Sequence, residues 1–244
     1  MDAAEYRRMA AHEDRHWWFV GRRAVLDAVL TALALPPGAR ILEIGCGTGG
    51  NLPLLARHGT VSAVETDDFA RDLATTRSGI AVQAGALPDR LPAHGAPFDL
   101  VCLFDVLEHV ADDAAALRAL APLLAPGGRL LLTVPAHRWL WGVHDERLHH
   151  RRRYARGELR ARLEEAGFAM DRLGFFNAAL LLPAMAARLL DRWGNRRSAL
   201  GGGLPPVWLN RLLGALFAAE APWLRRHTLP CGLSLLAVAH AGGA

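Results

Sequence analysis

The chain has 244 residues, of which 52% are hydrophobic, and its formal net charge at pH 7 is +4. This size and composition predict one globular domain with a substantial core. All 28 cationic side chains are arginine, so the sequence excludes reactions that need a lysine Schiff base, a P-loop lysine or the Tyr-Lys pair of short-chain dehydrogenases.

Two helices are predicted before the first strand. Residues 3–35 carry apolar side chains at helical spacing and end at Pro36, Pro37 and Gly38, which stop a helix. We expect residues 1–38 to form a helical lid over the ligand site, with Trp17 and Trp18 contacting a substrate.

Five strands then alternate with helical stretches. This alternation predicts an α/β fold with a Rossmann-like, doubly wound sheet of seven strands, mostly parallel, with an antiparallel C-terminal strand. In such a sheet the ligand lies at the carboxyl ends of the strands. The five predicted strands are Arg40–Ile44, Thr60–Glu65, Ile80–Ala84, Phe98–Phe104 and Arg129–Val134.

The C-terminal part of the chain contains a predicted helix, Arg156–Gly167, and a closing strand, Gly232–Ala241. We expect the closing strand to pair antiparallel with a neighbour around Asp171–Phe176. Residues 175–230 are longer than the usual connection at this point of such a fold, which indicates a helical insertion. The whole chain, 1–244, is then one domain with four parts: lid (1–38), core (39–174), insertion (175–230) and closing strand (231–244).

A glycine-dense turn follows the first strand directly. Gly45, Gly47 and Gly50 match the G-x-G-x-x-G pattern of dinucleotide-binding loops, and Glu65 follows 20 positions after Gly45. Glycines let the backbone turn tightly and approach a ligand closely. Glu43, two residues before the first glycine, suits a cationic or amino-bearing ligand better than a pyrophosphate, which a carboxylate repels.

Four segments, in order, resemble the class I S-adenosylmethionine-dependent methyltransferases. The family's motif I is matched by Glu43-x-Gly45-x-Gly47-x-Gly49. Its second strand, its fourth strand with the following turn, and its fifth-strand unit are matched by SAVETD (62–67), FDLVCLFDVLEHV (98–110) and LAPGGRLLLTVP (124–135). The chain is similar in particular to the bacterial type 11 and type 23 group, and its HWWF and HHRRRY segments are seen in bacterial members.

The resemblance implies S-adenosylmethionine as the cofactor and assigns residues to it. Glu65 would hold the ribose hydroxyls. Backbone groups of Ala86 and Leu87 would meet the adenine, because Gly85 stands where the family often has an aspartate. The other implied cofactor contacts are Glu43, Gly45, Cys46, Gly47, Gly49, Asn51, Thr66, Gly85, Phe104 and Asp105.

Residues 136–155, after the fifth strand, are rich in histidine and arginine. Arginines attract a phosphate or a carboxylate, so we expect His144, His150 and Arg153 to contact the substrate. A charged, solvated lead-in to the next helix explains the same pattern.

The candidate catalytic residues lie in and before this loop. Asp145 and His149 are four residues apart and would share one face of a helix, which favours a catalytic pair. His109, just past the fourth strand, is a second candidate base, with a buried structural histidine as the alternative. Tyr154 would orient the acceptor.

A metal site is a separate hypothesis. Asp105, Glu108 and His109 form D-x-x-E-H, which is similar to the E-x-x-E-H metal site of ubiquinone-biosynthesis and small-RNA methyltransferases. Oxygen ligands with an imidazole suit Mg²⁺, which would lower the pKa of a bound acceptor. Because Asp105 is one carbon shorter than the family's glutamate, we predict no metal, and expect Glu108 and His109 to cap the next helix and line the pocket.

An apolar stripe at helical spacing lies within residues 207–217, and such a stripe is usually core. The alternative is a cap that receives a lipid-like substrate or rests on a membrane surface, where Arg188, Arg192, Arg196 and Arg197 would meet anionic head groups. One short basic cluster and a net charge of +4 argue against nucleic acid. The stripe consists of Trp208, Leu209, Leu212, Leu213, Leu216 and Phe217.

The expected location is the cytoplasm, with peripheral membrane contact through residues 175–230 as an addition. Cys46, Cys102 and Cys231 lie far apart, which argues for a reducing compartment. Residues 1–16 are too charged for a signal peptide, and the longest uncharged apolar segment, Phe175–Ala187, is too short to span a bilayer. No feature of the sequence indicates the oligomeric state.

The function that the resemblance implies is methyl transfer by in-line displacement to a small or lipid-linked acceptor, with O-methylation favoured over N- or C-methylation. Two other classes remain open. The chain could bind S-adenosylmethionine without catalysis, a property that sequence alone cannot separate from turnover. A nicotinamide-dependent oxidoreductase would need the glycine loop nearer the start of the chain.

Overall fold

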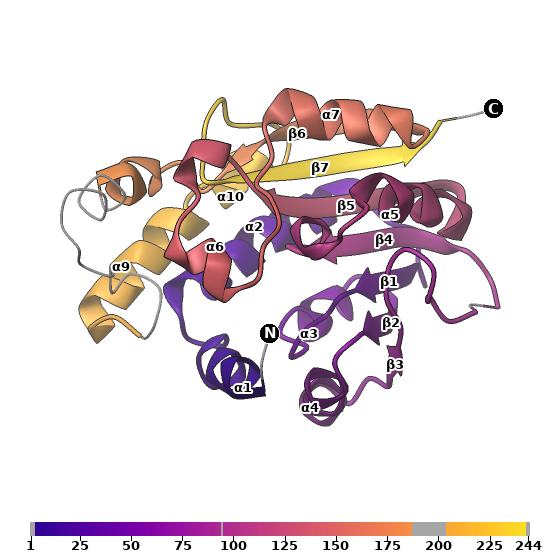
Figure 1. The fold of residues 1–244 in the computed structure, drawn as a ribbon, viewed down its shortest axis with the longest axis horizontal. Helices are drawn as coiled ribbons and strands as arrows, with labels where there is room; N and C mark the ends of the chain where they lie inside the picture. Colours follow the sequence, from indigo (N-terminus) through magenta and orange to yellow (C-terminus); the bar gives the residue numbers. More distant parts are fainter. Residues whose placement is uncertain (1–2, 94, 187–203, 243–244) are drawn as a thin grey trace.

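A computed structural model describes residues 3–93, 95–186 and 204–242. Its seven strands form one sheet (Figure 1). The strands are β1 (Arg40–Ile44), β2 (Thr60–Glu65), β3 (Val82–Ala84), β4 (Phe98–Phe104), β5 (Leu124–Pro135), β6 (Phe168–Phe176) and β7 (Ser234–Ala241). Their order across the sheet is β3-β2-β1-β4-β5-β7-β6. The pairs among β1 to β5 are parallel, and β7 runs antiparallel to both β5 and β6, which confirms the predicted fold class.

Helices cover both faces of the sheet and the edge near β3. The α-helices are α1 (Ala3–His12), α2 (Trp17–Leu33), α3 (Leu52–Leu55), α4 (Asp68–Ser78), α5 (Asp113–Leu120), α6 (Val143–Arg147), α7 (Arg156–Glu165), α9 (Val207–Ala218) and α10 (Ala221–Leu224). Three 3₁₀ turns are η1 (Leu107–His109), η2 (Ala121–Leu123) and η3 (Arg138–Leu140). The two predicted N-terminal helices and the predicted helix after residue 155 are thereby confirmed.

Three predicted strands begin at other residues than predicted, and glycines explain two of the differences. The closing strand begins at Ser234 rather than Gly232. The third strand begins at Val82 rather than Ile80, because Gly79 ends α4 in the left-handed region (φ 71°) and the chain is still turning at Ile80. The fifth strand begins at Leu124, which already pairs with Phe98. The register of this pair shifts before Leu100, where the glycines of the fifth strand allow the bend.

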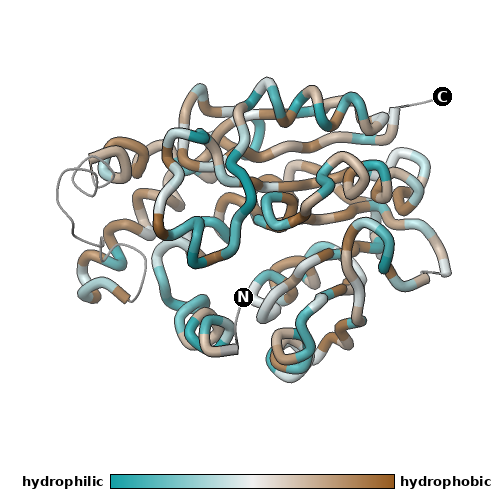
Figure 2. The backbone as a smooth tube through the Cα atoms, in the orientation of Figure 1, coloured by the Kyte–Doolittle hydropathy of each residue, from teal (hydrophilic) through white to brown (hydrophobic). Residues whose placement is uncertain are grey.

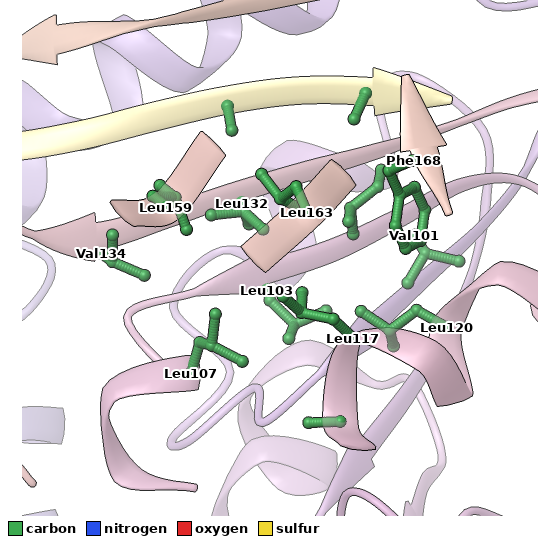
Figure 3. Packing of buried hydrophobic residues seen from close by; sticks show 14 of the residues in the cluster. Val101, Leu103, Leu107, Leu117, Leu120, Leu132, Val134, Leu159, Leu163 and Phe168 are labelled. Atoms are coloured by element: carbon green, nitrogen blue, oxygen red, sulfur yellow. The ribbon is translucent and has the colours of Figure 1, made fainter. Parts of the chain in front are cut away.

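The core consists of two layers, one on each face of the sheet. Val101 and Leu103 of β4 pack with α5 and α7, and Figure 3 shows this layer with Leu117, Leu159 and Leu163. The alternate residues Leu100 and Cys102 pack with α2, α9 and α10 on the other face. Each fully buried leucine stabilises the fold by about 1.5–3 kcal/mol.

The apolar stripe of α9 is only partly core. Phe217 is fully buried and stacks on Phe176, whereas Trp208 is 68% exposed and Leu212 and Leu216 are also exposed. The interpretation of the whole stripe as core is therefore wrong. The four arginines between 188 and 197 lie outside the described residues. Among the helices that the structure describes, none is long and apolar enough to cross a membrane.

Candidate cofactor and acceptor site

The glycine loop after β1 has a shape that only glycine tolerates. Gly45, Gly47 and Gly49 lie in the left-handed region, with φ values of 74°, 56° and 83°. A Cβ on Gly45 would lie 2.6 Å from Cγ2 of Val106, and one on Gly49 would lie 3.0 Å from Ala74. The backbone conformation and the lack of space both require residues without a side chain. A ligand can therefore approach the backbone of this loop closely.

Glu65, at the end of β2, holds this loop in place. One carboxylate oxygen accepts the N–H of Gly47 at 2.7 Å, and the other accepts the N–H groups of Thr66 (2.8 Å) and Asp67 (3.0 Å). The carboxylate is buried, so these three donors satisfy it. Because each oxygen has two lone pairs and Oε1 already accepts two bonds, Oε2 keeps one acceptor position for a ligand hydroxyl.

Glu43 is buried beneath the loop with one oxygen satisfied. Its Oε1 accepts from Asn51 Nδ2 at 2.9 Å, and its Oε2 has no partner among the described residues. Burial, together with the charge of Glu65, raises the pKa of Glu43 to about 7. An orphaned carboxylate oxygen next to a glycine cradle fits a ligand that carries a positive charge or an amino group. S-adenosylmethionine carries both, so these residues fit the implied cofactor.

The first helix lies against the same loop. A Cβ on Gly47 would lie 3.2 Å from Met9 Cε, and Glu13 accepts from the Thr48 hydroxyl at 2.8 Å. Tyr6 is buried, and burial and the nearby charge of Glu65 raise the pKa of its phenol. Tyr6, Met9 and Glu13 share helical spacing, a signal that sequence reasoning left unused.

Arg22 connects the N-terminal helices to the end of β4. It pairs with Asp105, which stands at φ 57°, and its guanidinium lies 4.5 Å from the centre of the Trp18 ring. The neighbouring Trp17 packs on Phe217 of α9, with 6.4 Å between the ring centres. Of the two tryptophans, Trp18 is thus connected to the site through Arg22, and Trp17 contributes to the packing of α9.

The predicted adenine contacts are altered by local pairing. A Cβ on Gly85 would lie 2.7 Å from Val64 and 2.8 Å from the Arg90 carbonyl, so no side chain fits there. The N–H of Ala86 already donates to that carbonyl at 2.9 Å. The N–H of Ala86 therefore already has a hydrogen-bond acceptor within a turn. Leu87, half-buried against the core, remains the proposed adenine contact. Of the other predicted contacts, Thr66 is exposed, and the side chains of Cys46 and Phe104 are core.

The loop after β5 is organised by Asp145, but not with the predicted partner. Asp145 is fully buried and accepts from His150 Nδ1 at 2.9 Å, Arg153 Nε at 2.8 Å and the N–H of Gly142 at 2.9 Å. Burial opposes ionisation, yet these bonds and the Arg153 charge lower the pKa of Asp145 to about 2. The Asp145-His149 pair is wrong, because α6 ends at Arg147 and His149 stands exposed at φ 56°.

The structure does not support the predicted roles of three further residues. His144 lies exposed on α6. Arg153 is buried, with its donors on Asp145 and on the Ala136 carbonyl at 3.1 Å. Tyr154 is fully buried and donates to Asp113 at 3.0 Å, so its hydroxyl is not accessible to an acceptor. Figure 2 shows this loop as a mainly hydrophilic segment beside the hydrophobic strands.

His109 and Glu108 lie where η1 meets this loop. Burial, then the neighbouring His150, lower the pKa of His109 to about 4, so the ring is neutral near pH 7. A hydrogen bond to the backbone of His149 orients the ring. Glu108 is fully buried, and neither carboxylate oxygen has a hydrogen-bond partner in the described part of the chain, although Oε1 lies 4.0 Å from His150 Nε2. Burial and the charge of Asp105 raise the pKa of Glu108 well above its usual range.

A metal-compatible group exists here, with a different membership from the predicted one. Glu108, His109 and His150 each offer a ligand atom, and these atoms lie within 4.8 Å of one another. Asp105 does not belong to the group, because Arg22 holds its carboxylate. His150, 41 positions beyond His109, replaces it, and its participation depends on the tertiary fold.

Comparison with known proteins identifies the family. Residues 13–173 match the model of a methyltransferase domain. The Ubiquinone biosynthesis O-methyltransferase of Xylella fastidiosa (strain M23) is 44% identical over 115 residues, which cover 44% of this chain and 46% of that protein. The chain thus spans about half the length of the curated relatives it matches.

Solved structures with low sequence identity share the fold. A Haloferax volcanii methyltransferase in complex with its Trm112 activator has a TM-score of 0.64 at 19% identity, covering 99% of this chain and 96% of that one. The cyclase SpnF has a TM-score of 0.57 at 18% identity, covering 92% and 82%. With the glycine loop, Glu43, Glu65 and the seven-stranded sheet, these matches agree with the domain model: the chain belongs to the S-adenosylmethionine-dependent methyltransferases of the class I fold.

Proposed function

We propose that this chain transfers the methyl group of S-adenosylmethionine to a hydroxyl oxygen of a small or lipid-linked acceptor. The observation that carries this proposal is the position of His109. It follows β4 on the turn whose Val106 packs against Gly45 of the glycine loop. A neutral imidazole thus lies on the segment that contacts the cofactor loop.

The chemistry requires little of the protein beyond alignment and a proton acceptor. A methyl group on a sulfonium is already electrophilic, and in-line alignment supplies up to about 7–11 kcal/mol. A hydroxyl acceptor must lose its proton as the new bond forms. The imidazole that donates to the His149 backbone has one nitrogen left with a lone pair, which can accept that proton. Its low pKa keeps it unprotonated at neutral pH, although it also makes His109 a weak base.

The relatives support a hydroxyl acceptor. Their name describes O-methylation in ubiquinone biosynthesis, and residues 13–173 of this chain match a methyltransferase domain model. The group Glu108, His109 and His150 offers a second route, since a divalent cation held there would lower the pKa of a bound hydroxyl. Chelation of metals separates the two routes.

The exposed face of α9 supports an acceptor that is linked to a lipid. Val207 and Trp208 are each 68% exposed, and Leu212 and Leu216 continue the apolar surface along the helix. An amphipathic helix of this kind can lie on a membrane surface. We therefore include peripheral membrane contact in the proposal. Binding to lipid vesicles that Trp208→Ala and Leu212→Ala weaken together would support it.

The first experiment measures methyl transfer directly. Purified protein is incubated with methyl-labelled S-adenosylmethionine and either a polyprenyl-substituted catechol or a matched aniline, with and without EDTA. An O-methylated product that is unaffected by EDTA supports His109 as the base, and loss of product with EDTA supports the metal route. Binding of S-adenosylhomocysteine without turnover on any acceptor would leave a non-catalytic binding protein. Binding of NADH instead would favour the oxidoreductase class.

A further inference from the structure

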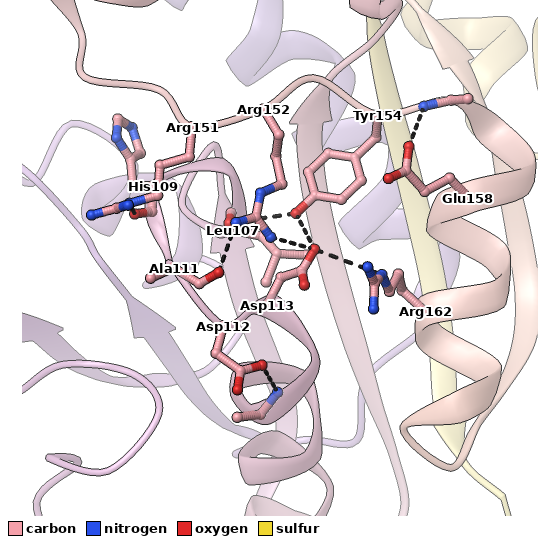
Figure 4. Close-up of polar contacts among 12 residues, drawn as sticks. Leu107, His109, Ala111, Asp112, Asp113, Arg151, Arg152, Tyr154, Glu158 and Arg162 are labelled. Carbon is pink, nitrogen blue, oxygen red and sulfur yellow. Dashed lines mark hydrogen bonds and ion pairs between the residues drawn. The ribbon is translucent and has the colours of Figure 1, made fainter.

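A large hollow lies outside the glycine loop, between α5, α7 and the loop after β5. Its volume is about 830 Å³, which falls within the range of small-molecule sites. Figure 4 shows several of the side chains around it. The lining residues come from three places: the start of α5 (Ala111 to Ala114), the loop after β5 (Arg138, Trp141, Arg151, Arg152 and Arg153) and α7 (Glu158 and Arg162).

The hollow is strongly basic. Five arginines face three carboxylates among its lining residues, a net charge of +2. Three of the arginines form ion pairs with carboxylates of the protein. Arg153 is buried on Asp145, Arg138 pairs with Glu158 at 2.5 Å, and Arg152 pairs with Asp113 at 2.8 Å. These contacts shape the walls of the hollow. They leave Arg151 and Arg162 with Asp112, whose carboxylate accepts from the N–H of Ala115 at the start of α5.

Arg151 and Arg162 are paired with carboxylates less closely than the other three arginines of the hollow. Arg151 is exposed and donates through Nε to the carbonyl of His109 at 3.1 Å. No carboxylate in the described ranges forms an ion pair with it. Arg162 Nε lies 4.0 Å from an oxygen of Asp113 that Arg152 and Tyr154 already occupy at closer range. Figure 4 shows these two side chains on opposite sides of Asp113.

We infer that this hollow binds the phosphoryl group of an anionic ligand. Guanidinium groups present planar pairs of N–H donors that match phosphate oxygens. The excess of arginines over carboxylates in the lining favours an anionic ligand. The volume leaves room for the group to which the phosphate is attached.

The contact between Arg151 and His109 indicates which ligand this is. Arg151 donates to the backbone of the residue proposed as the base, so a phosphoryl group in the hollow lies beside the acceptor site. We therefore assign the phosphoryl group to the methyl acceptor. This assignment rests on the proposed methyl transfer, whereas phosphoryl binding itself does not.

The test is calorimetric titration of the full chain with inorganic pyrophosphate at low ionic strength, without cofactor. Arg151→Gln and Arg162→Gln each remove one charge-assisted donor pair, and we expect each to raise the dissociation constant about tenfold. Arg160→Gln is the matched control, because Arg160 lies on the same helix with 46% side-chain exposure, against 40% for Arg162, and does not line the hollow. We expect it to change the dissociation constant less than twofold.

Vesicle sedimentation distinguishes two sources of the phosphoryl group. Sedimentation with phosphatidylcholine vesicles only when they contain phosphatidic acid, whose phosphate is a monoester, supports a lipid headgroup if pyrophosphate reverses it. Pyrophosphate binding without sedimentation supports a soluble phosphate ester. Absence of pyrophosphate binding at millimolar concentration overturns the inference, as does equal weakening by Arg160→Gln and Arg162→Gln. Binding of S-adenosylhomocysteine, measured on the same variants, shows that they are folded. Pyrophosphate binding by a protein without turnover would retain the phosphoryl site and reject only the proposed reaction.

Discussion

The glycine loop after β1 and the loop after β5, which we propose to form one site, are shaped by different physical means. The glycine loop is shaped by backbone conformation, with Gly45, Gly47 and Gly49 in the left-handed region and one carboxylate, Glu65, holding three N–H groups. The loop after β5 contains a buried cluster of charged side chains around Asp145. A single substitution should therefore affect ligand binding in the first region and folding in the second.

The largest effect is expected from removing Asp145. Asp145→Ala leaves the Arg153 guanidinium and the His150 ring without their buried acceptor, and we expect the free energy of unfolding to fall by about 3–5 kcal/mol. Chemical denaturation at pH 7 measures this loss. The control is Glu146→Ala at the exposed neighbouring position, which should change stability by less than about 0.5 kcal/mol. Similar losses in both variants would contradict the role of the buried cluster.

The pH dependence of wild-type stability provides a second test of the role of Asp145. Its pKa is lowered to about 2 in the folded state, against about 3.9 in an unfolded chain. The unfolded state therefore takes up the proton first as the pH falls. The stabilisation is present above pH 4 and is lost between about pH 4 and pH 2, and Asp145→Ala should lack this component.

Glu65→Ala is the corresponding test of the glycine loop. The substitution removes the acceptor of three N–H groups, at about 1 kcal/mol each. We expect the dissociation constant of S-adenosylhomocysteine to rise roughly 10²- to 10³-fold, with a smaller loss of stability than in Asp145→Ala. Calorimetry measures the affinity. Asp68→Ala, at a position whose side chain is 86% exposed, is the control and should bind normally.

His109→Gln tests the place where the two regions meet. If the ring accepts the acceptor's proton, its removal should lower kcat about 10²-fold and leave cofactor affinity unchanged. His149→Asn is the comparison, because His149 is exposed and asparagine tolerates its positive φ. Labelled methyl transfer measures both variants. A larger loss in His149→Asn would return the base to the residue that sequence spacing favoured.

The difference between the regions also explains what the sequence could predict. The cofactor loop is local: the residues that shape it lie within a few positions of one another and follow a strand. The fold class followed from the alternation of strands and helices in the same way. Gly85 shows where locality ends, because a side chain there would contact not only the nearby Arg90 carbonyl but also Val64 of β2, 21 positions earlier.

The residues predicted to act on the acceptor are positioned by contacts that sequence spacing does not reveal. Asp145 and His149 are correctly spaced for one helical face, but α6 is too short to continue to His149, and the chain turns so that His150 meets Asp145. In the sequence, Tyr154 is an aromatic residue in a polar loop. In the structure, its hydroxyl is buried and donates to Asp113, which lies 41 positions away. Such partners are set by tertiary packing.

The smallest expected effect concerns Glu43, whose pKa of about 7 lies far above that of an ordinary glutamate. A bound sulfonium favours the ionised carboxylate, so S-adenosylmethionine should bind up to about tenfold more weakly at pH 6 than at pH 7.5. Glu43→Gln should remove this pH dependence. The sign for stability is opposite: because the folded-state pKa is raised, stability falls as the pH rises from about 4.3, the pKa of glutamate in an unfolded chain, to about 7. The glutamine variant should therefore be more stable than the wild type at pH 8 without ligand, yet bind the cofactor more weakly. Thermal unfolding with and without S-adenosylmethionine measures both signs, and an equally pH-dependent affinity in Glu43→Gln would assign the titration to another group.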